Sequence, residues 1–221
     1  MPYIVVHFLN THLYTVHNMN NREKEDTVTL EILRVIEDKK DLTQRHLASR
    51  LDVALGLANS YLKRCVHKGL VKISQAPANR YFYYLTPKGF AEKSRLTKEY
   101  LSSSFDFYRK ASNSLNQVFT ECKNNNKKNI VFCGISELTE IAYFRSSDFQ
   151  VSITNILDLN TKKKSFLHIP VANSLDELSD FDVCIVTSIE DANHYFNYLS
   201  KNIEKEKIMM PSILGFQGKQ I

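Results

Sequence analysis

The segment from Leu42 to Leu85 constrains the fold more than any other stretch, because its hydrophobic period changes at Gly69. Before this glycine, apolar residues recur at helical spacing in two runs, with an N-cap residue, Thr43, at the start and a break at Asp52 between them. After the glycine, a loop leads into the β-rich run Tyr81–Leu85. This order predicts helix, turn, helix and hairpin, which is the arrangement of a winged helix.

The second predicted helix, which begins near Ala54 and ends at Gly69, carries the candidate binding surface. Its inward stripe is apolar, whereas its outer face offers amide, hydroxyl and cationic donors and no carboxylate. In helix-turn-helix proteins the second helix enters the major groove, and a basic wing can reach the minor groove or the phosphates. The predicted DNA-binding residues are Thr43, Gln44, Asn59, Ser60, Lys63, Arg64, Lys68, Lys72 and Arg80.

Positive charge is concentrated around this segment. Between Lys39 and Lys110 there are fifteen Lys and Arg residues against five Asp and Glu residues, although the whole chain has a formal net charge of +5. Such asymmetry argues for a polyanionic partner, double-stranded DNA, and predicts salt-dependent binding through released counterions. The alternative is a winged helix used only for protein–protein contacts, in which these cations merely solvate a surface.

The rest of the composition bounds the class of protein. A chain of 221 residues with 43% hydrophobic content is long enough for one or two domains with their own cores. Its four cysteines form no CxxC pair, which is typical of reduced thiols in a cytoplasmic protein, and no apolar run is long enough to span a membrane. The chain has no nucleophile elbow, HExxH motif or GxxxxGK[ST] motif, so we do not expect an enzyme.

The pattern divides the chain into four parts. Residues 1–26 form an N-terminal extension and residues 27–87 the winged-helix DNA-binding domain, whose first helix is expected to be capped at Asp26 or Thr27. Residues 88–124 form a long helix, and residues 127–221 a Rossmann-like domain. The extension lacks the features of a secretory signal, and its three histidines share no helix or strand face, so no metal site is predicted. It is open whether this extension is a strand, a partner-contacting arm or a misassigned start.

The long helix is expected to begin after an N-cap at Thr86 and to continue without a breaker to about Asn124. Its apolar positions alternate at four and three residues, like the seam of a coiled coil, at Leu101, Phe105, Tyr108, Ser112, Leu115, Phe119 and Cys122. This seam predicts a homodimer, which would place two recognition helices about one DNA turn apart. The alternative is that the stripe packs on the second domain of its own chain.

Strands that alternate with helices after residue 127 predict a parallel, Rossmann-like sheet. Gly134 ends the first strand, Ser136 opens the next helix, and Asp158 closes the second strand near the place of a ribose-binding acid. These three residues are the nucleotide-binding candidates, although only one glycine of G-x-G-x-x-G is present. We expect no bound cofactor. The alternative is an NAD-like ligand or a nucleotide-sugar, sensed by this domain to modulate DNA binding.

Two motifs carry a family resemblance. The run LxLANSYLKRCVHKGLVKI, with Gly56 at x, and the run YYLTPKGFAEKSRLTKEYL, from Tyr83 to Leu101, resemble MarR-type winged-helix regulators associated with exopolysaccharide or lipopolysaccharide clusters. The run GISELTEIAYF, from Gly134 to Phe144, is similar to the first turn and helix of the Rossmann-like half of some members, with Ile-Ser where Ala-Gly is usual. The resemblance implies a bacterial transcription regulator of surface-polysaccharide genes.

Overall fold

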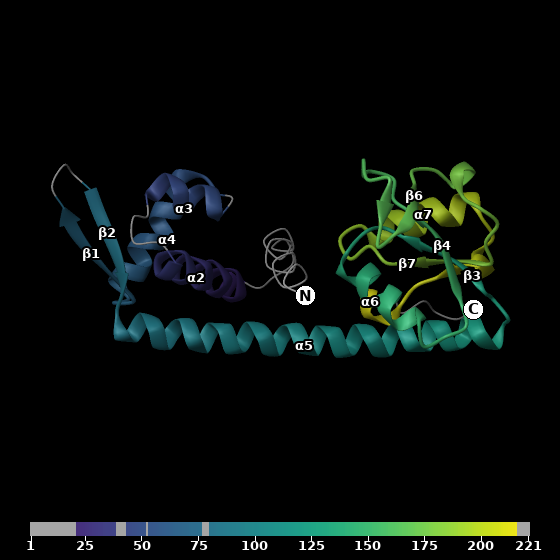
Figure 1. Ribbon diagram of the computed structural model, residues 1–221, viewed down its shortest axis with the longest axis horizontal. Coiled ribbons are helices and arrows are strands. Elements are labelled where there is room, and N and C mark those ends of the chain that lie inside the picture. The colour runs from purple at the N-terminus through teal and green to yellow at the C-terminus, as the bar shows by residue number, and fades with distance from the viewer. Residues whose placement is uncertain (1–20, 39–42, 52, 77–79, 216–221) are drawn as a thin grey trace. The chain divides into compact units, whose positions relative to one another are not determined.

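The computed structural model describes residues 21–38, 43–51, 53–76 and 80–215 (Figure 1). The chain forms two compact units, residues 1–104 and residues 105–221. The predictions made for residues 1–20 lie outside the described residues. Among the helices that are described, none is long and apolar enough to cross a bilayer.

Three helices build the core of the first unit: α2 (Asn21–Asp38), α3 (Gln44–Arg50) and α4 (Leu55–His67). Apolar side chains of α2 fill its centre, where Ile32 and Leu33 are fully buried. Because α2 begins at Asn21, the predicted N-cap at Asp26 or Thr27 is wrong. The segment NREKED is polar but contains no helix breaker, and its Arg, Glu and Lys residues are good helix formers.

Helix α4 ends at the predicted glycine. Lys68 is the C-cap, and Gly69 has a left-handed φ of 71°. The Leu70 N–H donates to the Cys65 carbonyl at 2.9 Å and the Gly69 N–H donates to the Val66 carbonyl at 2.9 Å, which together form a Schellman motif. This turn leads directly into the predicted antiparallel wing of strands β1 (Val71–Ala76) and β2 (Arg80–Leu85).

Helix α5 (Pro87–Asn124) begins at the predicted cap. The Thr86 hydroxyl accepts a hydrogen bond from the Gly89 N–H at 3.0 Å and donates one to the Gly69 carbonyl at 2.7 Å. A Cβ atom at Gly89 would lie 2.1 Å from the Leu70 carbonyl oxygen. The helix and the turn after α4 therefore approach so closely that only glycine fits at this position.

The second unit is an α/β domain built on a six-stranded sheet. Its strand order is β5-β6-β4-β3-β7-β8, and every neighbouring pair is parallel except β5 and β6. The elements are β3 (Asn129–Cys133), α6 (Glu137–Ser146), β4 (Ser152–Leu157), β5 (Ser165–Phe166), β6 (Ile169–Ala172), η2 (Leu175–Glu177), β7 (Val183–Val186), α7 (Ala192–Asn202), η3 (Lys205–Lys207), β8 (Ile208–Met209) and η4 (Ser212–Leu214). The order reverses at β3, as in Rossmann-like sheets, so the predicted class is confirmed; the short β5–β6 hairpin was not predicted.

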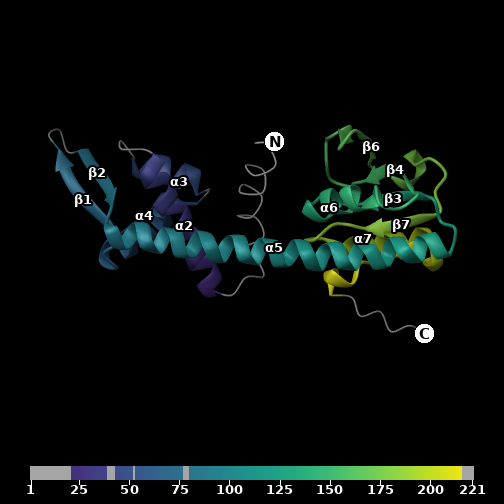
Figure 2. The same ribbon diagram turned by 60° about the horizontal axis from the view of Figure 1, so that its bottom comes forward.

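The C-terminal half of α5 covers one face of this sheet together with α6 (Figure 2). Leu115, Phe119 and Cys122 of α5 are fully buried there against residues such as Phe132 of β3. The other face packs on α7, for example through Tyr195. The last three apolar residues of the predicted seam therefore pack on the second domain of their own chain, which is the arrangement that the sequence left as the alternative to dimerisation.

Replacing Phe119 with alanine tests this packing. Because Phe119 is fully buried, Phe119→Ala should lower the free energy of unfolding of the second unit by about 3–5 kcal/mol through lost burial and an internal cavity. The matched control is Phe144→Ala on α6, where the phenylalanine is 55% exposed and the cost should stay near 0.5 kcal/mol. Chemical denaturation of both variants measures the difference. Equal losses would contradict the packing of α5 on the sheet.

Candidate functional site

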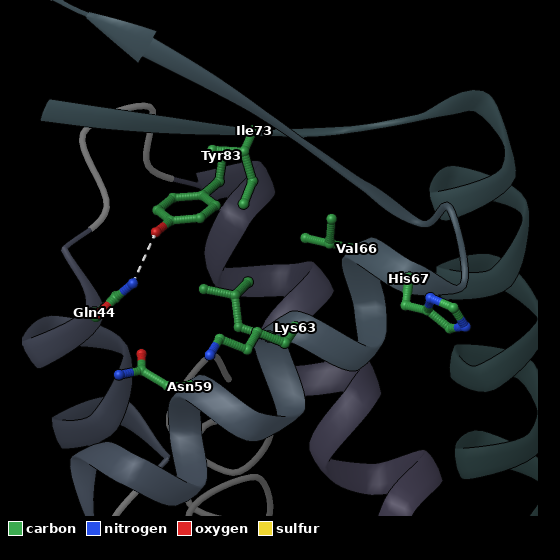
Figure 3. Close-up of a pocket in the computed structure, with 8 residues that line it drawn as sticks. Gln44, Asn59, Lys63, Val66, His67, Ile73 and Tyr83 are labelled. Carbon is green, nitrogen blue, oxygen red and sulfur yellow. Dashed lines mark hydrogen bonds between the residues drawn. The ribbon is translucent and has the colours of Figure 1, made fainter.

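The first unit has a pocket of about 450 Å³ between α3, α4 and the hairpin (Figure 3). Its polar lining is Gln44, Asn59, Lys63 and His67, and its apolar lining is Leu62, Val66, Ile73 and Tyr83. The Gln44 amide donates to the Tyr83 hydroxyl at 3.3 Å and so joins the start of α3 to the wing. The pocket therefore brings together three of the predicted DNA-binding residues: Gln44 of α3 and both Asn59 and Lys63 of α4.

The side chains of α4 divide as the sequence predicts. Ala58, Leu62 and Cys65 are buried, whereas Ser60 and Lys63 are exposed. Asn59 is half-buried, and its Oδ1 atom is enclosed with no hydrogen-bond partner among the described residues. Burial raises the pKa of the Cys65 thiol to about 11, so this cysteine is a packing residue and not a nucleophile.

Glu25 of α2 is the residue that sequence reasoning missed. Its carboxylate accepts a hydrogen bond from Lys68 Nζ at 2.9 Å and lies 3.9 Å from the guanidinium of Arg64. The hydrogen bond from Lys68 and the positive charges of both partners lower the pKa of Glu25. The outer face of α4 was predicted to hold no carboxylate; α4 itself carries none there, but α2 supplies one.

The predicted cations thus fall into two groups. Arg64 and Lys68 pair with Glu25, and Arg64 also lies over the Tyr61 ring at 4.4 Å. Lys63 and Lys72 are exposed, and neither forms an ion pair within the described part of the chain. Lys63 and Lys72 can therefore contact a phosphate without first breaking a salt bridge.

The other two predicted contacts lie at the edges of this surface. The Thr43 hydroxyl accepts from the His46 N–H at 3.1 Å, so it caps α3 as predicted. Arg80 is the first residue of β2 and pairs with Ala76 in the strand register, at the end of the hairpin next to residues 77–79, which lie outside the described residues. The cap fixes the first turn of α3, where Gln44 lies next to the pocket.

The nucleotide-binding candidates lie near the carboxyl end of β3, and each of them forms hydrogen bonds with neighbouring residues of the chain. Asp158 is 9% exposed, and its carboxylate accepts from the N–H groups of Ile135 at 3.0 Å, Asn160 at 3.1 Å and Thr161 at 2.9 Å. The Ser136 hydroxyl caps α6 by accepting from the Leu138 N–H. In a dinucleotide site the amide groups of the turn after the first strand bind the pyrophosphate, and here those of Ile135 and Leu138 are paired with Asp158 and Ser136.

Gly134 completes this closed arrangement. It has a left-handed φ of 92°, and a Cβ atom there would lie 2.3 Å from Cβ of Ser188, which follows β7. Its carbonyl accepts from the hydroxyls of Thr139 and Thr187, both at 2.7 Å. The glycine thus serves close packing between two loops of the chain itself.

Comparisons with known proteins follow the same division of the chain. Residues 25–72 match a family described as winged helix-turn-helix DNA-binding. The first unit therefore contains a winged helix-turn-helix DNA-binding domain. Among functionally curated proteins, none matches the chain significantly.

Several solved structures are distantly similar to this chain. MepR, a transcription regulator of the Staphylococcus aureus multidrug efflux pump MepA, is 18% identical over 47% of this chain and 76% of its own, with a TM-score of 0.33. The adhesin competence repressor AdcR from Streptococcus pyogenes is 15% identical over 66% of this chain and 92% of its own, with a TM-score of 0.34. Human N-acetylserotonin methyltransferase is 12% identical over 95% of this chain and 79% of its own, with a TM-score of 0.35. Likeness at this level does not identify a function.

Neutralising Glu25 tests its competition with DNA. Glu25→Gln should change stability by less than about 1 kcal/mol, because the pairs are partly exposed. Because Arg64 and Lys68 become free for phosphates, it should tighten binding to random duplex about two- to fivefold at low salt. The slope of log K against log salt concentration should become more negative by about one to two, since one or two more counterions are released. Fluorescence anisotropy at several salt concentrations measures both effects.

The matched control is Glu37→Gln. Glu37 pairs with Lys93 of α5, and the substitution gives the same change in net charge. A gain in DNA affinity as large as that of Glu25→Gln would show that net charge matters and the pairing at α4 does not.

Removing the Asp158 carboxylate tests the closed loop of the second unit. Asp158→Ala leaves three backbone N–H groups without an acceptor, so it should lower the free energy of unfolding by about 2–4 kcal/mol. Asp180→Ala, at an exposed position, is the control and should stay within about 0.5 kcal/mol of the unmodified protein. Urea denaturation measures both. An Asp158→Ala variant as stable as the unmodified protein would contradict a structural role for these three hydrogen bonds.

Proposed function

We propose that this chain is a transcription regulator that binds duplex DNA sequence-specifically as a homodimer. The observation that carries the proposal is the outer face of α4, where Asn59, Ser60 and Lys63 offer donors on the second helix of a winged helix-turn-helix DNA-binding domain. The exposed cationic side chain of Lys63 can contact a guanine edge in the major groove, and the Asn59 amide and the Ser60 hydroxyl offer further donors.

Sequence reading and general affinity come from different parts of this surface. Asn59, Ser60 and Lys63 lie along α4, whereas the exposed Lys72 lies on the first strand of the wing. The α4 side chains discriminate between base pairs, and Lys72 contributes phosphate contacts that are equal on all sequences. This division of roles is what a regulator needs to find one site among many.

Dimerisation is supported by the exposed apolar residues of α5. Leu101, Phe105 and Tyr108 are 46%, 59% and 44% exposed, and they follow one another at the four- and three-residue spacing of a coiled-coil seam. Three large apolar side chains in a row on one helix are costly to leave in water. A second copy of the same helix is the partner that this spacing suits.

The target genes are proposed from the sequence resemblance. The LTPKG run that ends at Gly89 belongs to the motif shared with regulators of exopolysaccharide and lipopolysaccharide clusters, and Gly89 fits closely against Leu70. Sequencing of the chromosomal fragments bound by the protein in its own cells tests this part. Bound sites away from surface-polysaccharide genes would refute the target assignment and leave the DNA-binding role intact.

Selection of bound fragments from a random DNA pool tests the central proposal. We expect a two-fold consensus whose half-sites are about 10 base pairs apart, because two recognition helices must enter the same side of the duplex. A pool that yields no enriched sequence would reject sequence-specific binding. A single unpaired half-site would reject the dimer.

A charge placed in the α5 seam should separate the two copies. Phe105→Glu should shift the protein from twice the chain mass to 25.6 kDa in sedimentation experiments and weaken binding to the two-fold site at least tenfold. Phe144→Glu is the control, because Phe144 is similarly exposed but lies on α6. Loss of the dimer in the control as well would contradict the placement of the interface on α5.

A further inference from the structure

The first turn of α4 exposes two leucines. Leu55 and Leu57, the first and third residues of the helix, are 46% and 45% exposed. The helix buries its apolar residues elsewhere, at Ala58, Leu62 and Cys65, so these leucines add nothing to the core. The first turn of α4 thus presents two partly exposed apolar side chains, whereas the exposed residues further along the helix are polar.

Gly56, between the two leucines, is not required by the fold. A Cβ atom there would meet nothing within 4 Å, and the backbone has no positive φ. Alanine would therefore fit and would be the better helix former. The N-cap, Ala54, makes no side-chain hydrogen bond, and the first turn contains no acidic residue. The turn thus lacks local stabilising features, is apolar, and carries no negative charge.

Charge complementarity identifies the partner of this turn as duplex DNA. One and two turns further along α4, Ser60 presents a hydroxyl donor and Lys63 a positive charge on the exposed side of the same helix. In helix-turn-helix domains the N-terminal residues of the second helix are the ones that meet base edges. The apolar group that the major groove offers is the C5 methyl of thymine.

We propose that Leu55 and Leu57 read thymine methyl groups, and that Gly56 allows the first turn of α4 to approach the bases closely. This inference rests on the proposed DNA-binding function and adds the chemistry that the helix recognises. It predicts thymines in each half-site beneath the start of α4, beside the purines that Asn59 and Lys63 contact. The residues with amide and cationic groups therefore account for only part of the sequence preference.

Replacing thymine with deoxyuracil in the selected site tests the proposal, because only the methyl group is removed. The unmodified protein should bind about fourfold more weakly for each contacted methyl that is lost. If Leu55 or Leu57 contacts a methyl group, the alanine variant should bind the thymine duplex and the duplex that lacks this methyl group equally well. The fourfold difference of the unmodified protein then disappears, as a double-mutant cycle requires. Lys72→Ala is the control: it should weaken binding to both duplexes and keep the ratio between them.

Gly56→Ala provides a second measurement that a misfolded variant cannot imitate. It should raise the melting temperature by about 1–4 °C, because alanine favours the helix, and weaken binding to the selected site about tenfold. Equal binding of thymine and deoxyuracil duplexes by the unmodified protein would overturn this inference. So would a thymine preference that survives in both leucine variants. Absence of binding to any duplex would instead refute the proposed function itself.

Discussion

The close contact between Gly89 and the Leu70 carbonyl is the constraint on which the first unit depends. It lets the start of α5 lie directly on the turn that ends α4, and the Thr86 hydroxyl bonds to the same turn through the Gly69 carbonyl. Three elements therefore meet within a few residues: the end of α4, the first strand of the wing and the start of α5. The orientation of the outer face of α4 relative to the wing is fixed by backbone packing at this junction.

Much of this unit could be predicted from the sequence because its signals are local. The Schellman turn at Gly69, the caps at Thr43 and Thr86 and the change of hydrophobic period each lie within a few residues of chain. The start of α2 was mispredicted, because the polar residues before Asp26 were taken for a loop, although polar residues can also form a helix. In the second unit, strands β5 and β6 were missed because, at two and four residues, they are too short to show an alternating hydrophobic pattern.

The parts of the candidate site that sequence could not predict depend on distant residues. Glu25 lies 43 positions before Lys68, and no pattern within α4 indicates that α2 brings a carboxylate to its face. The pairing changes which cations are available to DNA. The positive charge counted from the sequence is partly neutralised at Arg64 and Lys68, whereas Lys63 has no such partner within the described residues. A count of charges gives the field of a segment but not which side chains are available.

The second unit combines the strand order of a Rossmann-like sheet with internal hydrogen bonds at the carboxyl end of β3. The strand order reverses at β3, where a nucleotide would lie, yet the Ile135 N–H and the Asp158 carboxylate bond to each other across that place. Of the predicted nucleotide-binding residues, Asp158 takes part in this bond, and Gly134 and Ser136 flank Ile135 in the chain. The same sheet buries Leu115 and Phe119 of α5 on one face. The C-terminal half of α5 is therefore part of the core of the second unit.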